Sequence, residues 1–350
     1  MSEYSPNTPV LVGVAAVQQR LDDYRQALEP VALMEQALRS AAADAGCDGL
    51  LSRADEILVP RSLWGYSDPG RLLADALGSV SATTLLAEFG ILQQSLLSRA
   101  CQRIAAGEAQ VVLVTGGEAR YRSLCASKAG AEAAETRQVD VAPDTTLYPE
   151  DELWSAVESD SGLGMPVGYY AIMDSALRAK QGLSIDQHRD QMAAMYARFS
   201  ETAATNPDAW SDDPVSAAHI RNHSAANRML AFPYTKLHNS QWNVDQAAGL
   251  ILCSAALAEE MGIERCKWVF PRAATESNFM SVVASRKDLG GSAGFRIAGK
   301  VAMENAGVSF DELRLRELYS CFPFAVRVQL QEFGGRLDGD LSVTGGMSFG

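Results

Sequence analysis

Apolar and polar residues follow one another in blocks that predict alternating strands and helices over the first third of the chain. Val10–Val17 is a valine-rich run that is typical of a buried strand, and Glu56–Val59 is a second one. Pro30–Ala45 has apolar residues at helical spacing and begins with a proline, which suits the first turn of a helix. Leu72–Leu77 predicts a shorter helix. This alternation predicts a mainly parallel sheet with helices on both faces.

The segment Ala82–Ala119 gives the clearest pattern. It predicts an apolar strand, a tight junction at Phe89-Gly90, a long amphipathic helix and a second strand that ends in Gly116-Gly117. The first turn of a helix has free backbone N–H groups, so such a junction is a suitable place for a nucleophile or an anion. The junction residue, however, is Gly90, which has no side chain to do chemistry.

The pattern changes after Arg120. Residues 123–164 are rich in Ala, Asp, Glu and Ser, and they predict no sustained strand. Val167–Gln181 and Ile185–Ala203 then predict two helices, the second with Ser184 as its N-cap. We therefore expect a helical region after the first α/β half.

Alternating strands and helices return in the last third of the chain. Strands are expected from Ala247, from Trp268 and over residues 316–320, and helices between Gly294 and Ala306 and after Pro323. The chain ends at LSVTGGMSFG, a strand that runs into a glycine-rich turn. Since such a strand normally leads to a helix and a returning strand, we expect the second half to be incomplete and the chain to be a fragment. The segments expected for this α/β protein are an N-terminal half (1–120), a helical loop domain (121–243) and a truncated C-terminal half (244–350).

The composition is that of an ordinary globular protein. Of 350 residues, 47% are apolar and 21% are charged, which is enough apolar surface for a large core. The formal net charge of -13 argues against a nucleic-acid partner, because such partners are bound through clustered Lys and Arg. The longest uncharged apolar run has about a dozen residues, whereas roughly 18 are needed to span a bilayer, so no membrane span is expected.

The cysteines and histidines give no pattern that predicts a disulfide or a metal site. The six cysteines contain no CxxC pair, and the N-terminus has no signal-peptide pattern, so we expect a cytoplasmic protein. His219 and His223 stand four residues apart, but no HExxH motif accompanies them. We expect neither a metal site nor a tightly bound cofactor.

Five longer segments stand out in order along nearly the whole chain. They are QRIAAGEAQVVLVTGGEA from Gln102, AIMDSALRAKQGLSIDQHRDQMAAMYARFSETAATNPDAW from Ala171, PYTKLHNSQWNVDQAAGLILCS from Pro233, ELYSCFPFAV from Glu317 and LSVTGGMSFG at the end. Together they resemble the thiolase superfamily, especially thiolase-like proteins and thiolases related to sterol-carrier-protein thiolase. The resemblance implies two βαβαβ-type halves in αβαβα layers with a helical loop domain. It also implies acyl-CoA chemistry in lipid metabolism, in which a cysteine thiolate attacks a thioester carbonyl.

One departure from the thiolase pattern concerns the nucleophile. Counting back from the shared IAAGEA segment, the nucleophilic cysteine of the family falls on Gly90. Cys101 lies about three helical turns further on, which is too far to replace it. Ordinary condensation through a thiolate at this position is therefore not expected.

A second departure concerns the motif that helps to form an oxyanion hole in the family. The family has Asn-Glu-Ala-Phe or His-Asp-Cys-Phe, and this chain has Tyr319-Ser320-Cys321-Phe322. Tyr319 and Ser320 can each donate an O–H to a thioester oxygen. Cys321 is expected at the start of a helix, where a thiolate is favoured; the alternative interpretation is a small buried apolar residue. Gly345-Gly346 match the glycine pair that precedes the family's Gly-His-Pro loop, and they are therefore also candidates for CoA binding.

The resemblance also implies a set of candidate CoA-binding residues. Asn239 matches a family asparagine near the bound pantetheine, and the family's CoA-contacting serine falls on Gln241. Tyr234, Lys236 and His238 are further candidates, with Lys236 as a partner for a phosphate. The alternative for each is a solvated loop residue.

Three functions follow from these observations. The first is an acyl-CoA-directed enzyme of the acetyl-CoA C-acyltransferase type, for acyl transfer or 3-ketoacyl-CoA thiolysis, altered by Gly90. The second is a non-catalytic protein on the same scaffold that binds acyl-CoA or a partner. The third, a nucleotide-dependent oxidoreductase, is disfavoured because no GxGxxG follows the first strand. A homodimer is compatible with the resemblance, since thiolases usually pair through the sheet edges of their first halves.

Overall fold

The computed structural model describes residues 4–350, which divide into two compact units. Unit 1 is formed by the described residues up to Pro149 and by Asn243–Asn278. Unit 2 is formed by Glu150–Trp242 and Phe279–Gly350. In the described part of the chain, no helix combines the length and the apolar character that crossing a membrane requires.

Unit 1 is built around a six-stranded sheet with the order β1-β8-β4-β2-β3-β5. Its strands are β1 (Pro9–Gln19), β2 (Glu56–Pro60), β3 (Thr83–Ala87), β4 (Val111–Ala119), β5 (Thr145–Leu147) and β8 (Asp245–Ser254). The pairs β2–β3, β2–β4 and β3–β5 are parallel, while β8 is antiparallel to both β1 and β4. The mainly parallel sheet expected from the sequence is therefore confirmed, with β8 as its one reversed strand.

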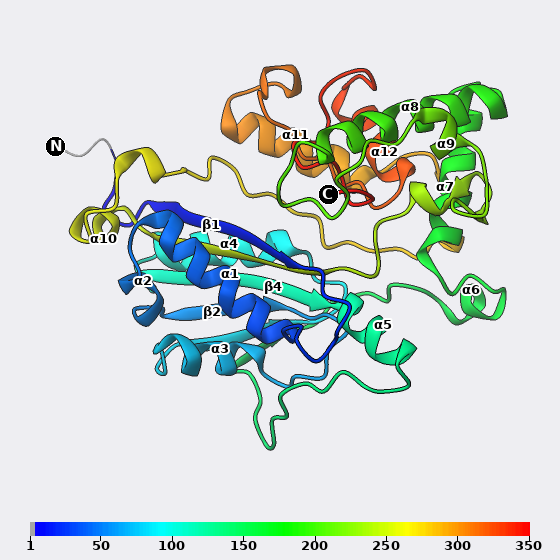
Figure 1. Cartoon of the computed structure of the whole chain (residues 1–350). Coiled ribbons are helices and arrows are strands. Elements are labelled where there is room, and N and C mark those ends of the chain that lie inside the picture. Colours follow the sequence, from blue (N-terminus) through cyan, green and yellow to red (C-terminus); the bar gives the residue numbers. More distant parts are fainter. Residues whose placement is uncertain (1–3) are drawn as a thin grey trace. The chain divides into compact units, whose positions relative to one another are not determined.

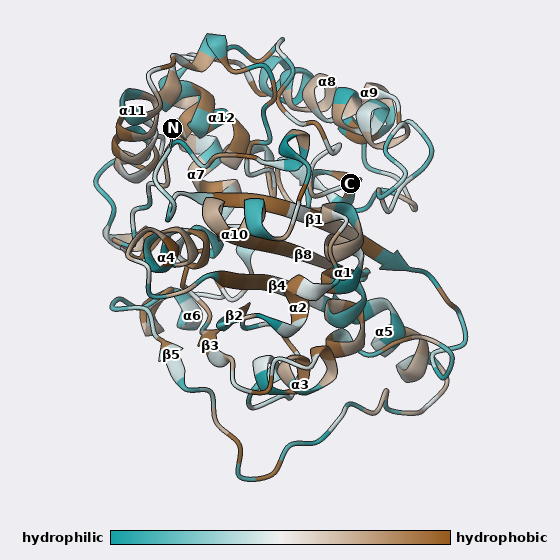
Figure 2. Cartoon of the chain, turned by 90° about the vertical axis from the view of Figure 1, so that its left-hand side faces the viewer, coloured by the Kyte–Doolittle hydropathy of each residue, from teal (hydrophilic) through white to brown (hydrophobic). Residues whose placement is uncertain are grey.

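Strand β8 comes from the last third of the chain but lies inside the first sheet. It pairs with the edge strand β1 on one side and with β4 on the other, so segments far apart in sequence lie side by side in this sheet (Figure 1). The apolar colouring of β4 and β8 in Figure 2 agrees with this position, because central strands are covered on both faces. The segment that the sequence assigned to a second half thus completes the sheet of the first.

Helices cover both faces of this sheet. The helices of unit 1 are α1 (Pro30–Ala45), α2 (Gly49–Ser52), α3 (Pro69–Leu77), α4 (Gln93–Ala105), α5 (Arg120–Lys128) and α10 (Ala255–Glu260). Helices α1 and α3 share one core with the sheet, and α4 shares another with its opposite face. A Cβ on Gly13 would lie 2.1 Å from the Ala41 carbonyl oxygen, and one on Gly249 would lie 2.7 Å from the Ala37 carbonyl carbon. Glycine at these strand positions therefore lets α1 lie directly on β1 and β8.

Unit 2 is mainly helical. Its helices are α6 (Ala156–Asp160), α7 (Pro166–Lys180), α8 (Ile185–Ala203), α9 (Ala217–Arg221), α11 (Ala293–Ala306) and α12 (Pro323–Phe333), and its two paired strands are β6 (Met229–Ala231) and β7 (Tyr234–Thr235). The expected cap of α8 is confirmed, because the Ser184 side chain accepts from the Gln187 N–H in a capping box. Helix α12 is central: eight of its 11 residues are buried, and they pack against α7 and α8.

Three strands expected in the last third are not formed. Residues 316–320 and 341–344 belong to no strand, and Trp268 lies next to a single isolated bridge between Leu11 and Val269. Between the first two segments the Leu318 N–H donates to the Leu341 carbonyl at 3.0 Å. A strand needs a ladder of such bonds along its length, so apolar sequence alone did not make these segments into a sheet.

Candidate functional site

Three segments of unit 2 are joined to one another at the beginning of α12. We call them the three-segment site: residues 235–241, 319–322 and 345–350. The Ser240 N–H donates to the Cys321 carbonyl at 3.0 Å, and the Met347 N–H donates to Ser320 Oγ at 3.0 Å. The Gln241 N–H donates to the Met347 carbonyl at 2.8 Å, which closes the set. The structure therefore brings together the segments in which the sequence placed most of its candidates.

Aromatic residues from neighbouring elements fix the middle segment. Phe322 is the N-cap of α12, and the Tyr170 ring of α7 stacks on it with centroids 4.3 Å apart. The Tyr234 ring also stacks on Phe322, with centroids 5.8 Å apart and an interplanar angle of 29°. Tyr196 of α8 donates its hydroxyl to the Ser320 carbonyl at 3.0 Å. The backbone at 320–322 is thus held by side chains of α7, α8 and β7.

Cys321 does not have the environment of a reactive thiolate. It is only 4% exposed and belongs to an apolar cluster with Tyr234, Phe322 and Ala325. It also precedes α12 by two residues and is not part of its first turn. Burial raises the pKa of the Cys321 thiol, and hydrogen bonding from Tyr170 and Tyr319 opposes this only in part. This environment does not favour a thiolate, and it agrees with the alternative interpretation of Cys321 as a small buried residue.

Tyr319 and Ser320 have different surroundings although they are adjacent. Ser320 is 1% exposed, and its Oγ is occupied by the Met347 N–H. Tyr319 is 50% exposed, while its backbone is held by the Gln329 side chain, which donates to its carbonyl at 2.8 Å. Burial of the phenol and the nearby Cys321 raise the pKa of Tyr319, so its hydroxyl stays protonated at neutral pH. Tyr319 is thus the residue of the motif with an exposed surface, while its hydroxyl lies against Cys321 and Tyr170.

Two of the five candidates for CoA binding in the segment 234–241 are internal. Tyr234 is fully buried and donates its hydroxyl to Asp174 Oδ2 at 2.7 Å. His238 is 1% exposed, and its Nδ1 accepts from the Thr235 N–H at 3.2 Å. Burial lowers the pKa of His238 to about 4, so the imidazole is neutral at pH 7. These two side chains support the site from within, and neither the ligand role nor the solvated-loop alternative fits their burial.

The other three candidates in this loop lie closer to the surface. Lys236 is exposed, and Asn239 and Gln241 are half-buried. The Asn239 amide donates to the Thr235 carbonyl at 2.7 Å, which closes the turn, and its own carbonyl accepts from Ser348 Oγ at 2.8 Å. Lys236 is therefore the candidate whose charged group is available to a phosphate.

The glycine pair of the third segment packs against α8. Gly345 and Gly346 have φ of 105° and 71°, in the left-handed region that favours glycine. A Cβ on Gly345 would lie 2.4 Å from the Ala203 Cβ, and one on Gly346 would lie 2.9 Å from the Phe199 ring. Glycine at these two positions lets the segment pack closely against α8. Because glycine has no side chain, the pair can contact a ligand only through its backbone.

Gly90, the position expected for the nucleophile, lies in a tight turn of unit 1. The Ile91 N–H donates to the Glu88 carbonyl at 3.0 Å, and Gly90 has φ of 101°. This is the arrangement of a type II turn, which requires a positive φ at its third residue. Helix α4 begins only at Gln93, with Leu92 as its N-cap. The helix N-terminus therefore does not coincide with Gly90, as the sequence suggested, but lies three residues further on.

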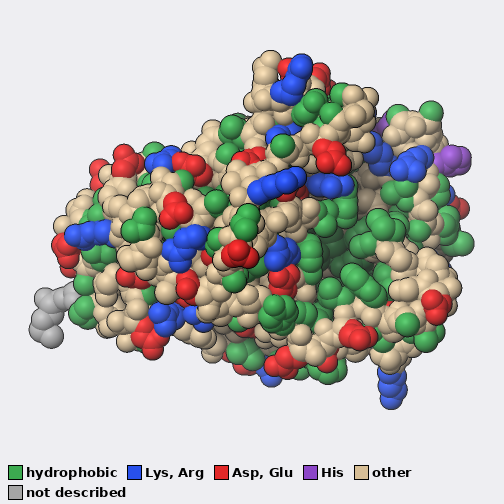
Figure 3. Space-filling model, turned by 90° about the horizontal axis from the view of Figure 1, so that it is seen from below, with side chains coloured by type: hydrophobic (Ala, Val, Ile, Leu, Met, Phe, Trp, Pro, Cys, Tyr) green, Lys and Arg blue, Asp and Glu red, His purple; other side chains and the backbone are tan. Residues whose placement is uncertain are grey.

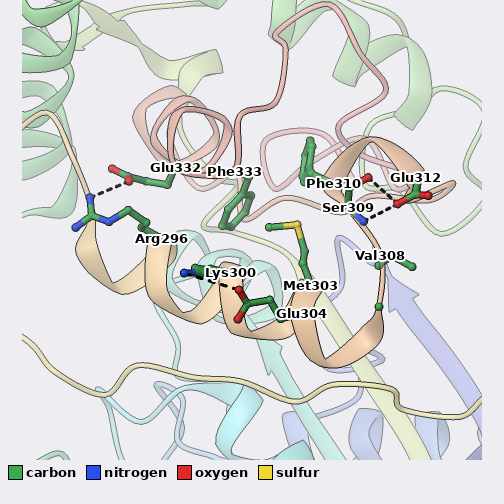
Figure 4. A pocket seen from close by; sticks show the side chains of 11 residues that line it. Arg296, Lys300, Met303, Glu304, Val308, Ser309, Phe310, Glu312, Glu332 and Phe333 are labelled. Carbon is green, nitrogen blue, oxygen red and sulfur yellow. Dashed lines mark hydrogen bonds and ion pairs between the residues drawn. The ribbon is translucent and has the colours of Figure 1, made fainter.

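Unit 2 also contains a cavity of about 610 Å³ between α11 and α12 (Figure 4). Met303, Phe310 and Phe333 provide apolar lining. The charged groups around it are paired with each other: Arg296 lies 3.3 Å from Glu332, and Lys300 lies 3.8 Å from Glu304. Each cation that lines the cavity thus has a glutamate beside it, and none of the expected site residues lines it.

The charged side chains of the described residues do not form a second candidate site. Among these residues, no group of three or more His, Cys, Asp or Glu side chains is arranged to hold a metal ion. The face of the molecule in Figure 3 carries acidic and basic side chains interspersed with one another. The three-segment site therefore remains the best-defined candidate in the described part of the chain.

Sequence reasoning missed two residues of α7: Tyr170, which contacts the site, and Asp174, which supports it through Tyr234. Tyr170 stacks on Phe322, and Asp174 accepts from Tyr234. They stand four residues apart on a predicted helix, so a shared face could have been inferred, but not its partners.

Solved structures of similar architecture were found for the whole chain. The SCP2-thiolase-like protein type 1 from Mycobacterium smegmatis, described as monomeric, is 28% identical with a TM-score of 0.80, and the match covers 99% of this chain and 68% of that one. The Ltp2-ChsH2(DUF35) aldolase is 18% identical with a TM-score of 0.71, covering 98% and 86%. The dimeric peroxisomal thiolase of Saccharomyces cerevisiae is 15% identical with a TM-score of 0.66, covering 99% and 87%. No protein-family model matches the chain, and no curated protein sequence matches it.

These likenesses define the class of the protein. The layered sheet of unit 1 and the helical unit 2 together form an α/β protein with the thiolase fold, as the sequence predicted. The chain belongs to the thiolase superfamily.

Proposed function

We propose that the three-segment site binds an acyl-CoA thioester and that Tyr319 is the polar group presented to it. The observation that carries this proposal is the contrast within one motif: Tyr319 is 50% exposed, whereas Cys321 is 4% exposed. A protonated phenol at this place can donate a hydrogen bond to the thioester oxygen, which gains negative charge when an enolate forms. Lys236, exposed in the neighbouring segment, is the proposed partner of a CoA phosphate.

The reaction class that fits these groups is carbon–carbon bond cleavage without an acyl-enzyme. In an aldol-type cleavage of a 3-hydroxyacyl-CoA, a base removes the hydroxyl proton and the bond between C2 and C3 breaks. A carbonyl compound leaves, and the enolate of the shorter acyl-CoA takes up a proton. No cysteine nucleophile is needed, which agrees with glycine at position 90 and with the raised pKa of Cys321. One structural neighbour is described as an aldolase, which supports this chemistry on a related scaffold.

Acyl transfer of the acetyl-CoA C-acyltransferase type is the second candidate. It is favoured by Cys321, the one thiol within the three-segment site. It would require this buried thiol to lose its proton on binding of the substrate, because only the thiolate is a nucleophile. If neither reaction occurs, the remaining proposal is a protein that binds acyl-CoA without turning it over.

The test uses the purified chain with 3-hydroxyacyl-CoA, and separately with acetoacetyl-CoA and CoA. We expect acetyl-CoA and an aldehyde or ketone from the first, little thiolysis from the second, and no acyl adduct in the intact mass. Tyr319→Phe should lower turnover about 100-fold, as removal of one oxyanion donor does. Tyr148→Phe, at an exposed tyrosine of unit 1, is the matched control and should leave turnover unchanged. Thiolysis with an adduct on Cys321 would favour acyl transfer instead, and binding without products would favour the non-catalytic protein.

A further inference from the structure

A buried charged cluster lies next to the three-segment site and connects three helices. Asp174 of α7 is fully buried and Arg327 of α12 is 2% exposed, with Arg327 Nη1 at 3.7 Å from Asp174 Oδ1. Arg327 also bonds to His188 Nδ1 of α8 and to the Gln181 side chain at the end of α7. His188 Nε2 lies 3.5 Å from Asp174 Oδ1. Asp174 is therefore the only carboxylate in a set of contacts that joins α7, α8 and α12.

Tyr234 connects this cluster to the first turn of α12. Its hydroxyl donates to Asp174 Oδ2 at 2.7 Å and accepts from the Phe324 N–H at 3.4 Å. Phe324 is the second residue of α12 and lies three residues after Cys321. Asp174 thus acts on α12 at two places, through Tyr234 at its first turn and through Arg327 one turn later.

The same face of α7 reaches the site directly. Tyr170 precedes Asp174 by four residues, so the two side chains lie above one another on the helix. Tyr170 stacks on Phe322 at 4.3 Å, and it also forms a hydrogen bond with the Cys321 thiol. One helical turn of α7 therefore contacts both the site segment and the start of the helix that follows it.

We propose that Asp174 is a positioning residue for residues 319–322, acting through the Tyr234 hydroxyl and Arg327 on the first two turns of α12. A buried carboxylate is costly unless its neighbours compensate it, and here the Tyr234 hydroxyl holds Oδ2 while Oδ1, which accepts no hydrogen bond, lies 3.7 Å from the Arg327 guanidinium. A shift of α12 against α7 would weaken both contacts, so they favour the observed arrangement. That arrangement sets where the Tyr319 hydroxyl lies. The catalytic meaning of this placement rests on the function proposed above, but the placement itself can be measured without it.

The first experiment compares two buried tyrosines in the same local arrangement. Tyr66 of unit 1 donates to Glu29 at 2.8 Å and accepts from the Val31 N–H, near the start of α1, at 3.4 Å. Tyr66→Phe is therefore a matched control for Tyr234→Phe, with an equivalent loss in the other unit. The measurement is the rate at which iodoacetamide alkylates Cys321 in the native protein, followed by peptide mass spectrometry.

We expect Tyr234→Phe to raise the alkylation rate of Cys321 about fivefold to tenfold, because loss of a hydrogen bond makes local opening of the segment easier. Tyr66→Phe should leave that rate within about twofold of the wild type, even if both variants lose similar overall stability. Equal rates in the two variants would overturn the proposal, since the effect would then follow global stability. An unchanged rate in Tyr234→Phe would overturn it as well.

A second variant tests whether Asp174 and Tyr234 act as one unit. Asp174→Asn removes the charge at nearly constant shape, and it should also raise the Cys321 rate. In the double variant with Tyr234→Phe, the effects should be less than multiplicative, as expected for residues that share one contact. Fully multiplicative effects would contradict the proposal.

The last measurement relates positioning to catalysis. Under the proposed function, Tyr234→Phe should lower kcat for 3-hydroxyacyl-CoA about tenfold with little change in KM, because a displaced donor acts mainly in the transition state. A change confined to KM would overturn the link between this contact and the position of Tyr319. If the wild type shows no turnover, the proposed function fails, and the alkylation rates alone then decide on Asp174.

Discussion

Gly90 in unit 1 and Cys321 in unit 2 occupy the two positions where the family motifs suggest cysteine chemistry, and each disfavours a thiolate for a different reason. Gly90 has no side chain and a φ of 101°, so the backbone itself is built for glycine. Cys321 has the thiol, but burial among aromatic rings raises its pKa. At position 90 the side chain is missing and the backbone conformation favours glycine. At position 321 the thiol is present, but its surroundings keep it protonated. The motif shows the first case directly, because glycine replaces the cysteine, but it cannot show the second, because the residue is retained and only its surroundings differ.

The largest effect on the environment of Cys321 is expected from the buried charges of Asp174 and Arg327. Arg327→Ala would leave Asp174 buried without its cation, which should lower the free energy of unfolding by about 3–5 kcal/mol. Urea denaturation followed by circular dichroism measures this. Arg336, which is exposed and paired with Asp338 at 2.8 Å, is the control, and Arg336→Ala should cost no more than about 1 kcal/mol. Similar losses in both variants would contradict the role given to burial.

The environment of unit 2 should also make stability depend on pH through His238. Burial lowers its pKa to about 4, whereas the unfolded chain has a value of about 6.5. Above pH 6.5 both states are neutral and the stability is fully present. Below it, the unfolded state binds a proton that the folded state excludes, so about 3 kcal/mol should be lost as the pH falls from 6.5 to 4. Urea midpoints across this window measure the slope, and His238→Gln should flatten it.

A cysteine introduced at position 90 tests directly whether the backbone there prevents thiolate chemistry. Gly90→Cys should cost about 1–3 kcal/mol, because an L-residue at this φ is strained, and it should not restore thiolysis of acetoacetyl-CoA. Gly164→Cys is the control, since a Cβ there meets nothing within 4 Å. Thermal unfolding and a thiolysis assay measure both effects. Recovery of thiolysis in Gly90→Cys would mean that the backbone, too, had kept the family's arrangement.

The smallest effect is expected for removal of the buried thiol. Cys321→Ala should lower the free energy of unfolding by about 1 kcal/mol, as loss of a small buried apolar group does, and turnover of 3-hydroxyacyl-CoA should persist. Cys266→Ala, at an exposed cysteine, should cost nothing measurable. Loss of turnover in Cys321→Ala alone would restore this residue to a catalytic role.

Much of the fold could be predicted from local pattern. Helices α1 and α8 begin and end where periodicity, Pro30 and Ser184 indicate, because these signals act within a few residues. The position of β8 could not be predicted in the same way, since its partners β1 and β4 lie more than a hundred residues before it. The strands expected at 316–320 and 341–344 did not form for a related reason: a strand needs a hydrogen-bonded partner strand, which local sequence does not reveal.

The site was predictable as a set of segments but not as a set of roles. The family motifs located residues 235–241, 319–322 and 345–350, and the structure connects them. Burial then separated the members: Tyr234 and His238 face inward, while Tyr319 stays accessible. Whether a polar side chain meets solvent or another buried group is decided by packing between distant helices, as Asp174 and Tyr234 illustrate.

The place of β8 in the sheet has a consequence for synthesis of the chain. All other strands of that sheet are complete once Leu147 has been made, but β8 begins only at Asp245. At about 5–20 residues per second, the ribosome needs several seconds or more to supply it. During that time β1 and β4 lack the strand between them, and their apolar residues and unpaired backbone groups stay open to other chains. Co-translational chaperone contact is therefore expected to peak before β8 emerges, and to fall once it has been inserted.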